Sequence, residues 1–302
     1  MHPNIISSHV SSPGIAFFNS STTTVQGNYI GTNLSGEEAA GFDNDTVGIA
    51  LIANSDDNLI GGTASGAGNL IRGNGGGIAV FSIQTNEAED NTIIGNTIYS
   101  NSGGPITTLG IDLMDDTDGN FSPDAELGVT PNDGNDVDTG TNDYLNFPAL
   151  NSSSANAGSL DVNFNLDIPN TNVGVTGYRV EFFANTTADA SGNGEGEIYL
   201  GSKVVSSDVT GEVATLTISQ SFASGSYAIT ATTTEIDGST DGFGATSEFA
   251  GNLNNQTITA AAGVSSTSSS LANTGKNTEL YFTVSVILIL SSTIYLNRRF
   301  NI

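Results

Sequence analysis

A short internal repeat constrains the fold of this chain more than any other feature of its sequence. A block of Gly, Ile, a small or acidic residue and an apolar residue occurs at residues 14–17, 48–51, 77–80 and 110–113. A second block begins with an apolar residue, has glycine at its third position and ends in asparagine or glycine. It occurs at residues 25–28, 59–62, 71–74 and 93–96. Repeats with a period of roughly 20–50 residues are typical of solenoids, propellers and arrays. Residues 1–114 are therefore predicted to form a repeat structure.

The length and residue types of the blocks predict short strands that end at sharp corners. An apolar residue that would face a core stands beside one that can face water, as in Val25 and Gln26 or Ile71 and Arg72. Glycine and asparagine follow because both tolerate the left-handed backbone that a corner requires. Short strands with a corner after each are typical of a parallel β-helix, in which every coil stacks on the one before.

The asparagines at these corners are expected to stack, with their amides hydrogen-bonded along the axis. Asn74 and Asn96 lie 22 residues apart, which predicts a coil of about that length. An antiparallel sandwich with Gly-Asn hairpin turns is the alternative. It explains the turns but not the fixed order of the two blocks, so we favour the β-helix.

These repeats resemble those of the right-handed parallel β-helices found in large bacterial surface and secreted proteins. The segments that carry the resemblance are residues 25–31, 58–74, 91–101, 110–113, 128–133 and 146–148. Three later segments resemble the Ig-like β-sandwich that follows the helix in that family, namely residues 180–185, 200–202 and 246–249. The resemblance covers residues 14–256. It implies an architecture rather than an activity, because the family includes adhesins and polysaccharide-acting enzymes.

Residues 149–256 show the alternation of apolar and polar residues that predicts an antiparallel sandwich. Residues 160–166 and 226–232 alternate with period two, and a Gly-rich segment at 191–194 is typical of a turn. Lys203 is the only lysine before the C-terminal tail. Leu200 and Val204 take the inward phase, so we expect Lys203 to be exposed rather than joined to another side chain by an isopeptide bond.

Residues 115–148 interrupt the repeat and are predicted to form an acidic linker. Asp116, Asp118 and Asn120 place oxygen atoms at alternate positions, a pattern that favours calcium, which binds oxygen ligands. Leu127 stands where a helix–loop–helix calcium site needs its bidentate glutamate. A solvated linker is therefore favoured, a calcium site and catalytic carboxylates stay open as alternatives, and calcium is the one cofactor that the sequence suggests.

The charge of the chain argues against nucleic acid as a partner. The chain has 32 acidic and 6 basic residues and a net charge of −26. Nucleic-acid binding needs clustered lysine and arginine to displace counterions from the phosphates. The absence of cysteine excludes disulfides and thiolate metal sites. Regularly spaced Ile, Val, Leu and Phe argue against disorder.

The tail combines three features of a membrane anchor. Residues 257–270 are rich in Ser, Thr and Ala, a composition typical of a flexible spacer. Residues 280–296 are mostly apolar and predict a transmembrane helix at the short end of the usual length. Arg298 and Arg299 follow and are expected to stay on the cytoplasmic side as a membrane stop.

The order of these parts, residues 271–302, resembles a Gram-positive sortase signal. The residues that match its motif are Leu271, Ala272, Asn273, Thr274 and Gly275. The resemblance implies cleavage between Thr274 and Gly275 by a sortase, which joins Thr274 to the cell wall. Ala272 stands where the commonest motif has proline, so a plain membrane anchor is the alternative.

Either form of the tail places the protein outside the cell. The first residues, Met1 to Asn4, do not begin a signal peptide, so the natural N-terminus is expected to lie upstream. The predicted fold class is all-β, a right-handed parallel β-helix followed by an Ig-like antiparallel sandwich and a C-terminal transmembrane helix.

The choice between enzyme and adhesin depends on the charged residues of the repeats. Glycoside hydrolysis needs a pair of carboxylates on one face of the coils, and elimination needs calcium with a nearby base. The repeat region offers His2, His9 and Arg72 as basic residues, and Asp112 as the one carboxylate in phase with the repeat. We therefore predict no catalytic residues and favour a structural or adhesive protein that binds a glycan or a host-surface partner. A surface-anchored polysaccharide lyase or glycoside hydrolase is the alternative, with catalysis possible in the part upstream.

Overall fold

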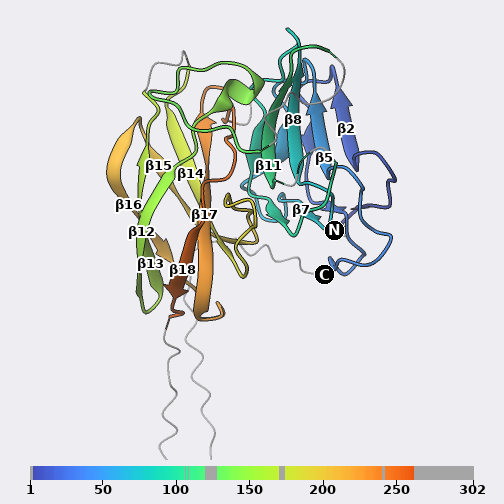
Figure 1. The fold of residues 1–302 in the computed structure, drawn as a ribbon. Coiled ribbons are helices and arrows are strands. Elements are labelled where there is room, and N and C mark those ends of the chain that lie inside the picture. Colours follow the sequence, from blue (N-terminus) through green and yellow to red (C-terminus); the bar gives the residue numbers. More distant parts are fainter. Residues whose placement is uncertain are drawn as a thin grey trace, which may run out of the picture. The chain divides into compact units, whose positions relative to one another are not determined.

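The computed structural model describes residues 3–105, 107, 109–119, 128–169, 174–239 and 242–261. These residues form β-strands and one short 3₁₀ helix, η1 (Thr141–Tyr144). Strands β1 to β11 build a parallel β-solenoid of about three turns, and strands β12 to β18 pair in antiparallel sheets (Figure 1).

Three parallel sheets run along the solenoid, and every strand pairs with the equivalent strand of the next coil. The first sheet contains β1 (Ile5–Ile6), β4 (Tyr29–Ile30), β7 (Leu70–Arg72) and β10 (Thr97–Tyr99). The second contains β2 (Ile15–Phe18), β5 (Ile49–Ile52), β8 (Ile78–Ile83) and β11 (Ile111–Asp116). The third contains β3 (Thr24–Val25), β6 (Leu59–Gly61) and β9 (Thr92–Ile94). Parallel pairing confirms the predicted stacking and rules out the antiparallel alternative for this region.

The inward residues of the three sheets share one apolar core. Val25, Ile60 and Ile93 lie in register on the third sheet and are 8%, 0% and 3% exposed. Ile71 is also buried, but it stacks between Ile30 and Ile98 on the first sheet. Stacking was expected to place Val25, Ile71 and Ile93 in one column, but they are buried in two columns on two different sheets. β-Branched side chains suit such positions because they pack well on a pleated surface.

The second sequence block of the repeat occurs at two different corners of the coil. Residues 25–28, 59–62 and 93–96 belong to the third sheet, whereas residues 71–74 belong to the first. Asn74 donates a hydrogen bond to Asn101, and Asn69 donates one to Asn96. Each pair is 27 residues apart, so this coil is longer than the 22 residues inferred from Asn74 and Asn96.

Buried asparagines form hydrogen-bonded ladders along the solenoid, as predicted from the corners. In one ladder the amide of Asn44 donates to Asn74, and the amide of Asn74 donates to Asn101, at 2.8 and 2.9 Å. The same amide oxygen of Asn101 also accepts the backbone N–H of Asn74 at 3.1 Å. Asn101 therefore satisfies a side-chain and a backbone donor of the coil before it. Such pairing is needed because an unpaired buried polar group is costly.

Residues 149–258 contribute two antiparallel sheets that enclose a second core. One sheet has the order β12 (Ala149–Asn156), β13 (Ser159–Leu166), β16 (Val209–Thr217). The other has the order β15 (Ile198–Val205), β14 (Gly177–Asn185), β17 (Gly225–Ile236), β18 (Leu253–Ile258). Phe164 and Phe182 from the two sheets meet edge to face, with ring centroids 5.5 Å apart. We call residues 149–258 the two-sheet domain.

Lys203 points to solvent at its charged end, as expected, and its ammonium lies 2.8 Å from Glu212. The phase of its strand differs from the prediction. Val204 is 56% exposed and Val205 is buried, because a register shift opposite Gly201 changes which side chains point inward. In the part of the chain that the structure describes, no helix is long and apolar enough to cross a membrane. The predicted span at residues 280–296 lies outside the described residues.

Candidate functional site

A groove of about 410 Å³ lies where the outer face of the third solenoid sheet meets Ser239 and Phe243. Eight residues line it: Thr22, Thr24, Asp57, Leu59, Asp90, Thr92, Ser239 and Phe243. Its volume is within the range of roughly 300–1,000 Å³ that small-molecule sites occupy. We call it the acidic groove.

The solenoid forms one wall of the acidic groove, and the residues of this wall occupy equivalent positions in successive coils. Thr22, Asp57 and Asp90 each stand two residues before the in-register positions of β3, β6 and β9. All three have a left-handed backbone, with φ of 55°, 55° and 52°. Aspartate tolerates this conformation better than most residues. Neighbouring strands lie about 4.8 Å apart, so the carboxylates of Asp57 and Asp90 come from adjacent rungs of one column.

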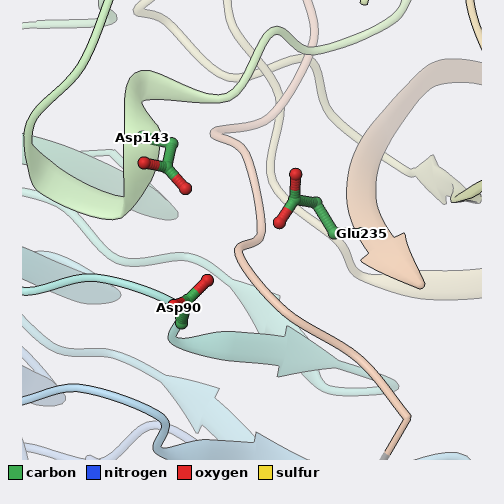
Figure 2. Close-up of side chains that lie close together, drawn as sticks. All are labelled: Asp90, Asp143 and Glu235. Carbon is green, nitrogen blue, oxygen red and sulfur yellow. The ribbon is translucent and has the colours of Figure 1, made fainter. Parts of the chain in front are cut away.

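Asp90 also belongs to a cluster of three carboxylates, of which it is the one that lines the groove. Asp90, Asp143 and Glu235 each place a carboxylate oxygen within 4.8 Å of the others, and they come from the chain before β9, from η1 and from β17 (Figure 2). Burial, followed by the charges of Asp143, Asp57 and other nearby carboxylates, raises the pKa of Asp90 to about 6. Burial and the charge of Glu87 raise the pKa of Asp143. The cluster therefore favours a positively charged group or a hydrogen-bond donor.

Hydrogen bonds hold the two walls of the groove together. The hydroxyl of Thr92 donates to the carbonyl of Gly244 at 2.8 Å, and the N–H of Ile93 donates to the hydroxyl of Thr246 at 2.9 Å. Asn142 in η1 joins both sides, because its amide donates to the carbonyls of Asn91 and Thr246 at 3.0 and 2.7 Å. These contacts fix the solenoid face against the segment after β17.

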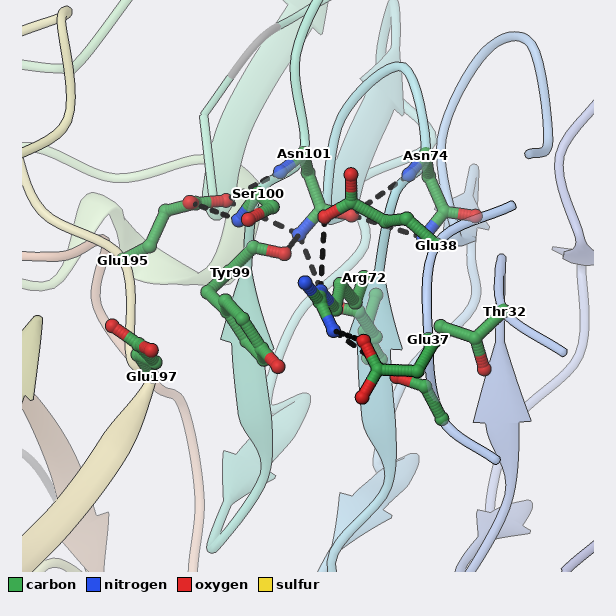
Figure 3. Close-up of polar contacts among 12 residues, drawn as sticks. Thr32, Glu37, Glu38, Arg72, Asn74, Tyr99, Ser100, Asn101, Glu195 and Glu197 are labelled. Carbon is green, nitrogen blue, oxygen red and sulfur yellow. Dashed lines mark hydrogen bonds and ion pairs between the residues drawn. The ribbon is translucent and has the colours of Figure 1, made fainter. Parts of the chain in front are cut away.

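Buried glutamates of the two-sheet domain accept hydrogen bonds from the last coil of the solenoid. Glu195 accepts the backbone N–H groups of Ser100 and Asn101 at 2.6 and 3.1 Å and the side-chain amide of Asn101 at 3.1 Å (Figure 3). Glu181 accepts the N–H of Gly95 at 2.9 Å and pairs with Arg179. We call Glu181, Glu195 and Glu248 the capping glutamates.

Glu248 is the third cap, and it lies beside the sequence-predicted residue Asp112. It accepts the N–H groups of Leu113 and Thr130 at 3.0 and 2.7 Å. Burial and the charge of Asp112 raise the pKa of Glu248, and burial raises the pKa of Asp112 to about 6. Asp112 is only 1% exposed. It therefore lies in the junction rather than on a face that a substrate could reach.

The apolar core of the solenoid is closed at the same junction by aromatic rings. Phe183 and Phe249 join the solenoid core, and their ring centroids lie 5.6 Å apart. Gly196 exchanges backbone hydrogen bonds of 2.6 and 2.9 Å with Ile98, in the place where the next coil would pair. The two-sheet domain thus covers apolar side chains and accepts backbone and side-chain donors at this end of the solenoid.

Arg72 differs from its expected status as an exposed charge. Its guanidinium lies 3.1 Å from Glu37 and 2.9 Å from Glu38, and 4.6 Å from the ring centroid of Tyr99 (Figure 3). Its side chain is only 19% exposed. These contacts fasten the loop before β5 to the first sheet. The Nδ1 of His9 lies 2.9 Å from the side-chain oxygen of Asn44, which accepts the hydrogen bond, so His9 lies at the start of a ladder. His2 lies outside the described residues.

The calcium residues suggested by the sequence are only partly described. Asp116 is fully buried at the end of β11, and one carboxylate oxygen accepts the N–H of Gly119 at 2.7 Å. Asp118 is exposed, and Asn120 lies outside the described residues. A different trio in the same region, Asp133, Asp136 and Asp138, has carboxylate oxygens within 4.8 Å of one another. Calcium at Asp116, Asp118 and Asn120 stays a prediction.

Sequence reasoning missed the carboxylate column of the groove. It identified Asp112 as the one repeat-phase carboxylate, whereas Asp57 and Asp90 occupy equivalent places on adjacent coils. The signal was present, because each aspartate precedes an asparagine, in Asp57-Asn58 and Asp90-Asn91. Asp143 and Glu235 could not be found in this way, since only the tertiary fold brings them to Asp90. The residues of the sorting motif and membrane stop, 271–275 and 298–299, lie outside the described residues.

Comparison of the chain with models of known protein families, with curated proteins and with solved structures found no match. The function must therefore be argued from the groove, the junction and the sequence of the tail.

Proposed function

We propose that this chain is a bacterial cell-surface protein with a structural or adhesive role, displayed by its C-terminal segment. In this proposal the solenoid is a right-handed β-helix, the two-sheet domain is an Ig-like sandwich, and residues 271–302 form a sorting signal. A sortase joins Thr274 to the cell wall, or the span at residues 280–296 keeps the protein in the membrane. The protein then presents a glycan-binding or partner-binding surface outside the cell.

One observation carries the structural part of the proposal. The capping glutamates, together with Phe183 and Phe249, close one end of the solenoid with side chains of the two-sheet domain. A solenoid end without such partners leaves strand edges open to association with other chains. This closure supports a rigid unit of solenoid and two-sheet domain, which would hold a binding surface away from the C-terminal anchor.

A surface-anchored lyase or glycoside hydrolase is the second candidate, and the carboxylates of Asp90, Asp143 and Glu235 favour it. Hydrolases of glycosides use a pair of carboxyl groups, one of which has a raised pKa. Asp90, with a pKa raised to about 6, meets the second requirement. Release of reducing ends from a polysaccharide distinguishes this candidate from a binding protein.

The anchoring is tested by cell fractionation of the full-length protein and a Thr274→Ala variant. We expect the unmodified protein to resist detergent and to be freed by a cell-wall hydrolase, because sortase has joined it to the wall. The Thr274→Ala protein is expected in the detergent-soluble membrane fraction, since the apolar span and the two arginines still hold it there. Asn273→Ala is the matched control, because the motif leaves that position variable.

Deleting residues 280–302 is expected to release the protein into the medium. If the unmodified protein is as soluble in detergent as the Thr274→Ala variant, the tail is a plain membrane anchor and the sortase assignment is wrong. If the deletion leaves the protein attached to cells, the tail is not the anchor.

A further inference from the structure

We infer that the acidic groove binds a hydroxyl-rich cationic saccharide, an oligosaccharide of amino sugars with free amino groups. This assignment deepens the proposed surface function by naming the class of ligand. It rests on three properties of the groove: its charge, its lining and the geometry of its solenoid wall.

The charge of the groove selects against anionic ligands. Asp57 and Asp90 line it, and Asp143 and the buried Glu235, which do not line it, lie close to Asp90 (Figure 2). None of the eight lining residues carries a basic side chain. A cleft lined by one sign of charge concentrates ligands of the opposite sign. An acidic polysaccharide is therefore excluded from this groove, and an ammonium group is favoured.

The other lining residues suit a ligand with many hydroxyl groups. Thr22 and Thr24 contribute hydroxyls, each of which can donate one hydrogen bond and accept others, and the hydroxyl of Ser239, which donates to the carbonyl of Phe243 at 2.9 Å, can accept. Phe243 contributes an aromatic ring on the opposite wall, against which an apolar ligand face can pack. Carboxylates, hydroxyls and one ring together match the alternating polar and apolar surfaces of a sugar.

The solenoid wall argues against a basic peptide as the intended ligand. Peptides bind sheets most simply by adding a strand, which requires free backbone donors and acceptors at an edge. The groove lies over the face of the third sheet, where β6 is paired with β3 on one side and β9 on the other. Recognition on this face must use side chains. Asp57 and Asp90 repeat at the coil spacing of about 4.8 Å, so they offer matching contacts to successive units of a ligand that runs along the solenoid axis.

The test is isothermal titration of the full-length protein, held in a non-ionic detergent that carries no sugar. The probes are a glucosamine tetrasaccharide, its fully N-acetylated form and tetralysine. The pH is set about one unit above the value of about 6 to which the pKa of Asp90 is raised, so that the carboxylate is mostly ionised. We expect the glucosamine tetrasaccharide to bind at least about tenfold more tightly than either other probe, a difference of about 1.4 kcal/mol.

Variants connect the binding to the groove. The double variant Asp57→Asn/Asp90→Asn is expected to weaken binding of the glucosamine tetrasaccharide at least about tenfold. The control Asp167→Asn/Asp208→Asn removes the same charge from two exposed positions outside the groove and is expected to bind normally. Phe243→Ala is expected to weaken binding about fivefold by removing the ring, an effect of about 1 kcal/mol. It also keeps the test valid if the double aspartate variant does not fold.

Three results would overturn the inference. The first is no binding of the glucosamine tetrasaccharide by the folded protein. The second is equal or tighter binding of tetralysine, which would mean that the groove recognises charge without sugar chemistry. The third is equal binding by the groove variants and by the control. None of these results affects the fractionation test of the anchor, so failure here and failure of the proposed display are distinguishable.

Discussion

At the scale of single residues, one of the capping glutamates, Glu195, takes the place of an asparagine at the end of a ladder. In the ladder, the amide oxygen of Asn101 accepts both the N–H and the side-chain amide of Asn74. One carboxylate oxygen of Glu195 accepts the same two donors from Asn101. Glutamate can do this because a carbonyl-type carboxyl oxygen has two lone pairs that accept hydrogen bonds. The ladder therefore ends on a residue that needs no further rung.

The value of a buried rung can be measured by removing Asn74. Asn74→Ala deletes the amide that accepts from Asn44 and donates to Asn101 and to the carbonyl of Ile30. Several buried polar groups lose their partner, so we expect the free energy of unfolding to fall by about 3 kcal/mol. Urea denaturation measures the change. Asn151→Ala is the matched control, because that amide also makes two hydrogen bonds but is exposed. An equal loss in both variants would show that burial does not set the cost.

At the scale of elements, the sequence predicted the type of strand and its parallel stacking but not which face each strand belongs to. The blocks ending at Asn74 and at Asn96 look alike because both corners of the coil need the same residue types. Only pairing separates them, with residues 71–74 on the first sheet and residues 93–96 on the third. A similar limit applies to Val204, whose exposure follows from a register shift in its strand.

The acidic groove shows why part of a site escapes sequence analysis. The column of Asp57 and Asp90 repeats with the coil, so its pattern is contained in the sequence. The opposite wall comes from Ser239 and Phe243, and Glu235 is far from Asp90 along the chain. No local pattern predicts this approach, because it depends on how the segment after β17 docks on the solenoid through Gly244 and Thr246.

The stacking of the solenoid makes one inward position of the third sheet critical. Ile93→Asp places a carboxylate in the column with Val25 and Ile60, where side chains are 8% and 0% exposed. An unpaired buried charge costs several kcal/mol, so we expect the solenoid to unfold. Circular dichroism and limited proteolysis measure the loss of structure.

Ala16→Asp is the control for this substitution. Ala16 is exposed on β2, in the column where β11 carries Asp112, so the variant is expected to fold normally. A soluble and cooperatively folded Ile93→Asp protein would contradict the stacked core.

At the scale of the whole molecule, the acidic character of the chain extends into its interior. The net charge is −26, and the two-sheet domain meets the solenoid through buried carboxylates rather than through pairs of opposite charge, except at Glu181 and Arg179. Burial is the largest influence on Glu195 and raises its pKa to about 7, although the N–H donors of Asn101 and Ser100 act in the opposite direction. Asp136 is similar, with burial raising its pKa to about 7.

These shifts predict that the protein is most stable in mild acid. A carboxyl group whose pKa is higher in the folded state binds more protons there than in the unfolded chain, so stability falls as the pH rises. For Glu195 the stabilisation is fully present below the ordinary value of 4.5 and is lost as the pH rises to about 7. Since one pKa unit corresponds to about 1.4 kcal/mol, Glu195 alone accounts for about 3 kcal/mol. Urea denaturation between mildly acidic and mildly alkaline pH measures the slope.

A Glu195→Gln variant shows how much of the change in unfolding free energy with pH comes from the junction between the solenoid and the two-sheet domain. Glutamine resembles the protonated carboxyl group, so the variant is expected to lose less stability than the unmodified protein as the pH rises. Glu197→Gln removes a charge from the same segment, where it binds the turn at Thr186, and serves as the control. Stability that rises from mild acid to neutral pH would contradict the prediction. It would mean that the hydrogen bonds to the capping glutamates outweigh their burial, so that the solenoid end is held by ionised carboxylates.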